Sequence, residues 1–246
     1  MGDPRGARQK AENDLVLSFL AVRRSIGALG FFLPLALIAF GMVAPQGILR
    51  SMSAAYYGPM REVFVGTLCA QAVFLWAYEG FRPNSGEIIS DRATARVAAV
   101  AAALIAFSPT SPQGILPAEG PFDPARDCTL LQCVLGVGTA DKLHLVAAAI
   151  YFAALAVCCL VLFPRGEVDS AEKAASNRIY RICGWLIVLS IGAVGVLFAT
   201  GLDVALLALR PVFWLEVVAT FAFATSWMVK GDALRPLVRG MARMRR

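Results

Sequence analysis

The residues that could carry acid–base chemistry are few in this sequence, and two of them stand three positions apart. His144 is the single histidine of 246 residues, and it follows Asp141 in the stretch TADKLHLVAAAIYF. On a helix these side chains share a face, so the carboxylate could hydrogen-bond the imidazole and His144 could act as a general base or a pH sensor. The alternative is structural: Asp141 starts the helix, and His144 bonds a neighbour or water. The sequence leaves both interpretations open.

Glu216 is the second residue that needs an explanation. It stands inside the apolar run RPVFWLEVVATFAF, five residues after Pro211 and one helical turn before Thr220. At 1.5 Å per residue it lies about 8 Å below the start of that run. A charged group is costly in hydrocarbon, so a carboxylate at this depth requires a partner or a use.

The elements that position these residues are predicted from hydropathy. Hydrophobic residues make up 58% of the chain, with a mean hydropathy of +0.66, and about 20 apolar residues are enough for a helix to cross a membrane. Six segments qualify: residues 25–44, 60–81, 93–111, 143–163, 179–202 and 211–229. The predicted fold class is therefore all-α, a polytopic membrane protein. It has an interfacial N-terminal segment (1–24), a six-transmembrane-helix domain (25–230) and a basic tail (231–246).

The distribution of basic residues predicts the orientation, because cytoplasmic loops carry an excess of Lys and Arg. The N-terminal segment, the connections after the second and fourth spans, and the C-terminal tail hold most of these residues. Both termini are therefore expected on the cytoplasmic side of a bacterial inner membrane. The tail RPLVRGMARMRR would then lie against anionic lipid.

In this orientation several polar residues share the outer end of the bundle. They are Ser53 and Tyr57 in the first outer loop, Arg61 and Glu62 at the start of the second span, Asp141 and His144 at the start of the fourth, and Glu216 in the sixth. We therefore predict an outward-facing polar pocket formed by these residues. A metal ion held by His144, Asp141 and Glu216 is a further alternative, although their spacing matches no common metal motif.

Two of the six cysteines lie outside the apolar segments. Cys128 and Cys133 fall in the longest outer loop, and the topology places this loop in an oxidising compartment, where disulfides persist. Four intervening residues allow a small closed loop, so we predict a Cys128–Cys133 disulfide. A C-x4-C pair without a second pair lacks the spacing of a zinc site.

Common enzyme motifs do not accompany these residues. The sequence has no GxGxxG, GxxxxGKS/T, HExxH or GxSxG pattern, so we expect no cofactor and leave enzymatic activity undecided. The net charge is +6, but the basic residues border apolar spans, which argues against nucleic acid as a partner. Membrane lipids are the expected partners, and the small residues of the third to fifth spans leave a homo-oligomer open.

Four stretches together resemble a known pattern: SMSAAYYGPMREVFVG, AALIAFSPTSP, DKLHLVAAAIYF and FWLEVVATFAFATSWMVKG. They resemble an uncharacterised bacterial family of six-helix membrane proteins and, more distantly, the DRAM-type family, the damage-regulated autophagy modulators. The shared outline is a serine-containing outer loop, a third span ending at Phe107-x-Pro109, and a fourth span opening near His144. This resemblance implies a six-helix bundle with a lipid-related or membrane-trafficking role.

A more remote likeness to membrane hydrolases that include alkaline ceramidases would imply a zinc site of three histidines. A chain with one histidine cannot build that site in its usual form.

Three hypotheses of function follow. In the first, the outer pocket binds or transports a lipid headgroup, a small polar solute or an ion. In the second, the protein is an acid–base enzyme acting on lipid of the outer leaflet, with His144 as the base and Asp141 orienting it. The third is a structural or pore-forming subunit of an oligomer.

Overall fold

The computed structural model describes residues 4–81, 89–112, 123 and 127–243, and it describes side chains from residue 19 onward. Within these residues every regular element is a helix. The long helices are α1 (Pro4–Val43), α2 (Arg61–Ala77), α3 (Asp91–Phe107), α6 (Val137–Val157), α7 (Ala171–Thr200) and α9 (Pro211–Lys230). The shorter ones are η1 (Ser53–Tyr57), α5 (Leu130–Leu135), the π-helix η2 (Cys158–Leu162), α8 (Leu202–Ala205), η3 (Leu207–Leu209) and α10 (Arg235–Arg243).

Local chemistry explains where several of these helices begin. Ser90 and Ser170 precede α3 and α7, and the side-chain oxygen of each accepts a hydrogen bond from a backbone N–H of the first turn. Pro211 is the first residue of α9, where its missing N–H costs no hydrogen bond. The polar start of α7 therefore extends this helix well before the apolar segment that hydropathy predicts.

Among the described residues, four helical segments are long and apolar enough to cross a membrane: Phe19–Val43, Val137–Leu162, Ala171–Thr200 and Leu207–Lys230. The predicted second and third spans are also helical, as α2 and α3, but each has 17 residues. At 1.5 Å per residue these two helices are about 26 Å long. They are slightly shorter than the hydrocarbon core of about 30 Å.

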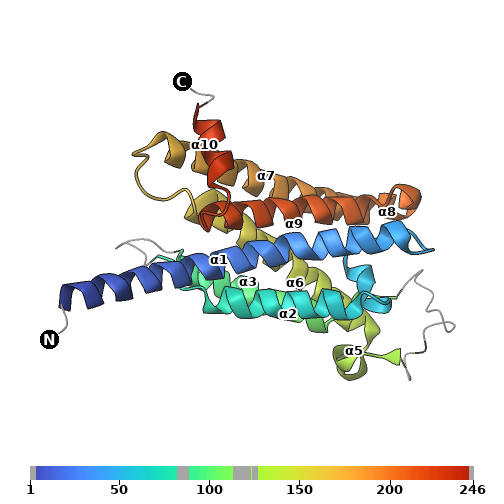
Figure 1. The fold of residues 1–246 in the computed structure, drawn as a ribbon. Coiled ribbons are helices and arrows are strands. Elements are labelled where there is room, and N and C mark those ends of the chain that lie inside the picture. The colour runs from blue at the N-terminus through green and yellow to red at the C-terminus, as the bar shows by residue number, and fades with distance from the viewer. Residues whose placement is uncertain (1–3, 82–88, 113–122, 124–126, 244–246) are drawn as a thin grey trace.

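The long helices pack in two layers (Figure 1). In one layer α9 lies between α1 and α7, and in the other α3 lies between α2 and α6. Contacts of α1 with α2 and of α6 with α7 join the layers, whereas α6 and α9 touch only sparsely. Buried alanines of α3, among them Ala95, Ala98 and Ala102, let its neighbours approach closely.

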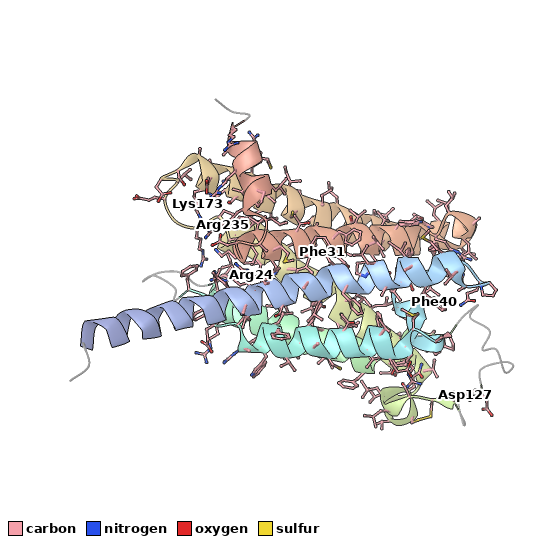
Figure 2. The ribbon with its side chains drawn as sticks, viewed as in Figure 1. Arg24, Phe31, Phe40, Asp127, Lys173 and Arg235 are labelled. Atoms are coloured by element: carbon pink, nitrogen blue, oxygen red, sulfur yellow. A yellow bond between two sulfur atoms is a disulfide. The ribbon has the colours of Figure 1, made fainter. Side chains whose placement is uncertain are left out.

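The bundle has two chemically different ends. We call the end where α2, α6 and α9 begin the disulfide end, and the end where α3 and α7 begin the basic end. Arg24, Lys173 and Arg235 gather at the basic end, whereas Asp127 lies at the disulfide end (Figure 2). The predicted boundary between an N-terminal segment and a first span does not appear as a break, because α1 is one helix of 40 residues.

Candidate functional site

The segment between α1 and α2 folds into the bundle at the disulfide end. Four successive residues of η1, from Ser53 to Tyr56, are buried. The Ser51 and Ser53 hydroxyls lie 3.1 Å apart, and Ser51 Oγ also accepts the Ala54 N–H at 3.2 Å. Ser53, a predicted ligand-binding residue, is therefore engaged in holding the turn.

Glu216 is bonded to this same segment. Its Oε2 accepts the backbone N–H of Met52 at 2.6 Å, so α9 is joined to the residue that leads into η1. Thr220, one turn later, donates to the Glu216 carbonyl at 2.8 Å. The Thr220 hydroxyl therefore bonds the backbone of α9, whereas the Glu216 carboxylate bonds the segment before η1.

His144 is 4% exposed and lies between α6 and the end of α3. Its Nδ1 is 2.6 Å from the carbonyl oxygen of Ser108, and the Ser108 hydroxyl donates to the Ala140 carbonyl at 2.7 Å. This reciprocal pair fastens the end of α3 to the start of α6. The sequence-based alternative in which His144 bonds a neighbour describes this geometry.

Asp141 does not start its helix, which corrects that part of the expectation. Helix α6 begins at Val137, after Gly136 with φ of 80° and ψ of 153°, so Asp141 lies in the second turn. Its Oδ1 accepts the backbone N–H of Ser111 at 2.7 Å. Asp141 thus holds the chain that leaves α3. The hydropathy pattern predicted the start of α6 too late, because most residues between Val137 and Leu143 are small or polar.

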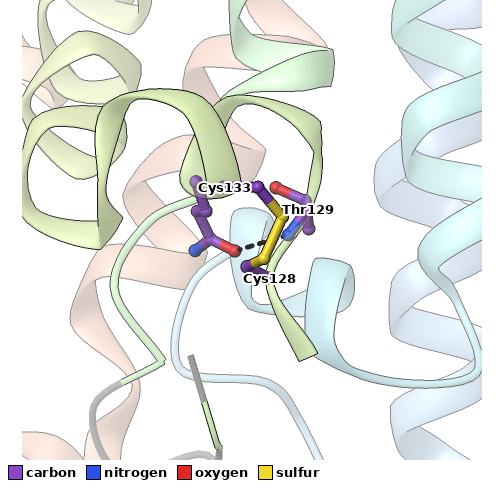
Figure 3. Close-up of a disulfide and its surroundings, with 4 residues drawn as sticks. Cys128, Thr129 and Cys133 are labelled. Atoms are coloured by element: carbon purple, nitrogen blue, oxygen red, sulfur yellow. Dashed lines mark hydrogen bonds between the residues drawn. A yellow bond between two sulfur atoms is a disulfide. The ribbon is translucent and has the colours of Figure 1, made fainter. Parts of the chain in front are cut away.

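Tyr57 connects η1 to the disulfide loop. Its hydroxyl donates to the carbonyl of Thr110 and accepts from Nε2 of Gln132 at 2.7 Å. The Oε1 of Gln132 accepts the Thr129 N–H at 3.2 Å as part of the capping box of α5. The predicted Cys128–Cys133 disulfide is confirmed and lies beside this cap (Figure 3).

Burial raises the pKa of the Tyr57 hydroxyl from 10 to about 12. A raised folded-state pKa contributes stability that is present below pH 10 and is lost as the pH rises toward 12. Tyr57→Phe should lower the free energy of unfolding by about 1 kcal/mol at neutral pH. The difference from the wild type should narrow between pH 10 and 12. Melting temperatures of the wild type and of Tyr57→Phe, measured in detergent across this pH range, test the prediction. A constant difference between the two proteins at all pH values would contradict it.

Arg61 and Glu62 are both exposed at the start of α2. The Arg61 guanidinium lies 4.9 Å from the centroid of the Tyr56 ring. Among the ion pairs of the described residues, none joins Arg61 to Glu62. The two side chains therefore form the accessible rim of the disulfide end.

Apart from Arg61 and Glu62 on the rim, the predicted residues consequently form two groups. His144, Asp141 and Tyr57 surround the chain that leaves α3, and Glu216 and Ser53 surround Met52. In the described part of the chain no hydrogen bond or ion pair links His144 to Glu216. The described residues also contain no group of three His, Cys, Asp or Glu side chains that could hold a metal ion, so the metal alternative gains no geometric support.

Sequence reasoning missed a polar pair inside the bundle. The Tyr151 hydroxyl donates to Oε1 of Gln71 at 2.9 Å, and both side chains are buried. Nε2 of Gln71 has no hydrogen-bond partner among the described residues. The signal was available, since an amide within the apolar stretch LCAQAVFLWA is costly in a membrane and calls for a partner.

The fold and these contacts define the class of the protein. It is a helical protein whose described part contains four helices apolar enough to span a membrane and a cluster of polar contacts at one end. Models of known families, curated proteins and solved structures give no match to the chain.

Proposed function

We propose that this chain is a six-span protein of the bacterial inner membrane with both termini in the cytoplasm. Its disulfide end then faces outward and binds or transports a lipid headgroup, a small polar solute or an ion. The resemblance to the DRAM-type and bacterial six-helix families is part of this proposal. Helices α2 and α3 complete the six spans in this proposal, because a bilayer thins locally around a helix that is a few ångströms shorter than its hydrocarbon core.

The observation that carries the proposal is the Glu216 carboxylate. It lies on a helix that is long and apolar enough to span a membrane, and its hydrogen-bond partner is a backbone N–H. No ion pair of the described residues includes it. A carboxylate that is costly to place in a membrane marks a functional site when no cation neutralises it. The ligand group that complements it is positively charged, such as the ammonium of a headgroup or a metal cation.

The enzyme hypothesis receives less support. It requires His144 to reach a substrate, but this side chain is 4% exposed and its Nδ1 is engaged by the Ser108 carbonyl. Asp141, the residue expected to orient it, accepts from Ser111 instead. These contacts favour a structural role for both residues.

Glu216→Gln tests the proposal, with Glu167→Gln at the basic end as the matched control. Glutamine keeps an oxygen that can accept the Met52 N–H, so the loop remains attached while the charge is lost. The probes are phosphatidylethanolamine, free ethanolamine and sodium ion, with binding followed by native mass spectrometry and by melting temperature in detergent. We expect at least one probe to bind the wild type and Glu167→Gln about 10-fold more tightly than Glu216→Gln. Equal binding by all three proteins, or binding of no probe, would refute the assignment of Glu216.

A further inference from the structure

A groove of 540 Å³ runs along α7, away from the candidate site at the disulfide end. Its volume is within the range of ligand sites in proteins, about 300–1,000 Å³. Its lining residues are Val168, Ala174, Asn177, Arg178, Arg181, Ile182, Trp185, Leu186 and Leu189. All but Val168 belong to the first two-thirds of α7, so the groove begins at the basic end and extends toward the middle of the bundle.

Polar groups are confined to the basic end of this groove. Arg178 and Arg181 are one turn apart on α7 and are exposed, and neither takes part in an ion pair of the described residues. Asn177 is 7% exposed, and its Oδ1 has no hydrogen-bond partner among the described residues. The groove therefore offers two cations to a ligand, whereas the unsatisfied Oδ1 of Asn177 is buried in its wall.

The rest of the groove is apolar. Ile182, Trp185 and Leu189 follow the arginines at helical spacing and are 51%, 57% and 65% exposed. Residues separated by three, four and seven positions lie along one line of a helix. The groove therefore has cations at the basic end and a row of apolar side chains that runs from them toward the middle of the bundle. This arrangement matches a molecule with an anionic head and a hydrocarbon tail.

A second groove provides an internal comparison. It has a volume of 380 Å³, lies against α2, α3 and α6, and contains Arg96 among apolar residues. Arg96, however, lies 3.9 Å from the Glu79 carboxylate, which also pairs with Arg92 at 3.2 Å. Arg96 therefore shares a carboxylate of the protein, whereas no ion pair of the described residues includes Arg178 or Arg181.

We propose that the α7 groove binds an anionic glycerophospholipid. The phosphate lies between the Arg178 and Arg181 guanidinium groups, which suit phosphate because of their fork of N–H donors. One acyl chain follows Ile182, Trp185 and Leu189. This site is at the opposite end of the bundle from Glu216 and does not depend on the function proposed there.

Native mass spectrometry of the full chain in detergent tests the site with long-chain phosphatidylglycerol and phosphatidylcholine. The variant is Arg178→Gln/Arg181→Gln. The control is Arg239→Gln/Arg243→Gln on α10, which removes the same charge from the basic tail. We expect the wild type and the control to prefer phosphatidylglycerol by about 10-fold, and the α7 variant to lose this preference. Because Arg178 and Arg181 are exposed, the α7 variant should keep the wild-type melting temperature.

Further arms distinguish the sources of the anion. Inorganic phosphate and glycerol 3-phosphate should raise the melting temperature far less than the lipid does. Trp185→Ala should weaken the binding of long-chain phosphatidylglycerol more than the binding of its dihexanoyl form. If the α7 variant still prefers phosphatidylglycerol, the α7 site is overturned. If only the α10 control loses this preference, the lipid binds at the basic tail and the proposal is likewise overturned. Equal stabilisation by phosphate alone replaces the lipid by a free anion and also overturns the proposal.

Discussion

Trp227→Ala is expected to cause the largest loss of stability among single substitutions in this protein. Trp227 is completely buried on α9, and its ring centroid lies 4.9 Å from that of Tyr78, 5.2 Å from that of Phe163 and 6.3 Å from that of Phe223. Tyr78 follows α2 and Phe163 follows η2, so the indole fills the junction of both helix layers. Its removal should lower the free energy of unfolding by about 3–5 kcal/mol, because close-packed neighbours cannot fill the cavity.

Titration of the folded protein with a denaturing detergent measures this loss. Trp214→Ala is the matched control, because Trp214 is on the same helix but is 43% exposed. We expect it to cost less than about 1 kcal/mol. If the two variants were equally stable, the junction would not be the centre of packing that the ring distances indicate.

Gly80→Ala should have the second largest effect. Gly80 has φ of 64°, a conformation in which a side chain is strained, and an added Cβ would lie 2.2 Å from Cβ of Asp91. The turn at Gly80 is also what brings the Phe81 N–H to Oδ2 of Asp91 at 3.3 Å, beside the Tyr78 hydroxyl. Strain and collision together should lower the free energy of unfolding by at least about 2 kcal/mol.

Gly66→Ala is the control for this substitution. Gly66 lies within α2, and an added Cβ there meets no atom within 4 Å. Alanine favours helix over glycine by about 1 kcal/mol, so this variant should be as stable as the wild type or more stable. The same detergent titration applies, and a Gly80→Ala protein as stable as Gly66→Ala would show that the turn tolerates a side chain.

Hydropathy predicts the helical class well because a backbone in hydrocarbon must satisfy its own hydrogen bonds, and a helix does so within one segment. All six apolar segments contain helices. Helix starts are less predictable, since capping and local polar residues determine them. Helix α7 begins at Ala171, after the Ser170 cap, and α6 begins at Val137, after Gly136. Both starts precede the apolar runs.

The candidate site shows a different limit. The sequence places His144 and Glu216 near the same end of the bundle, but the partner of each depends on which helices touch. His144 bonds the end of α3, and Glu216 bonds the segment before η1. The partner of each side chain is a backbone group, the Ser108 carbonyl for His144 and the Met52 N–H for Glu216. Residue types do not reveal such partners. The disulfide was predictable because it depends on two neighbouring cysteines and a short loop.

Under the function proposed above, the hydrogen bond between Glu216 and Met52 would couple ligand binding to the spacing of the two helix layers. Glu216 belongs to α9 in one layer, whereas Met52 leads into η1, which packs against α2 in the other. A cation bound through Oε2 would compete with the Met52 N–H for this oxygen. By thermodynamic linkage, a separation of the layers at this end would then raise the affinity of Glu216 for such a cation, and the bound cation would favour the separation to the same extent.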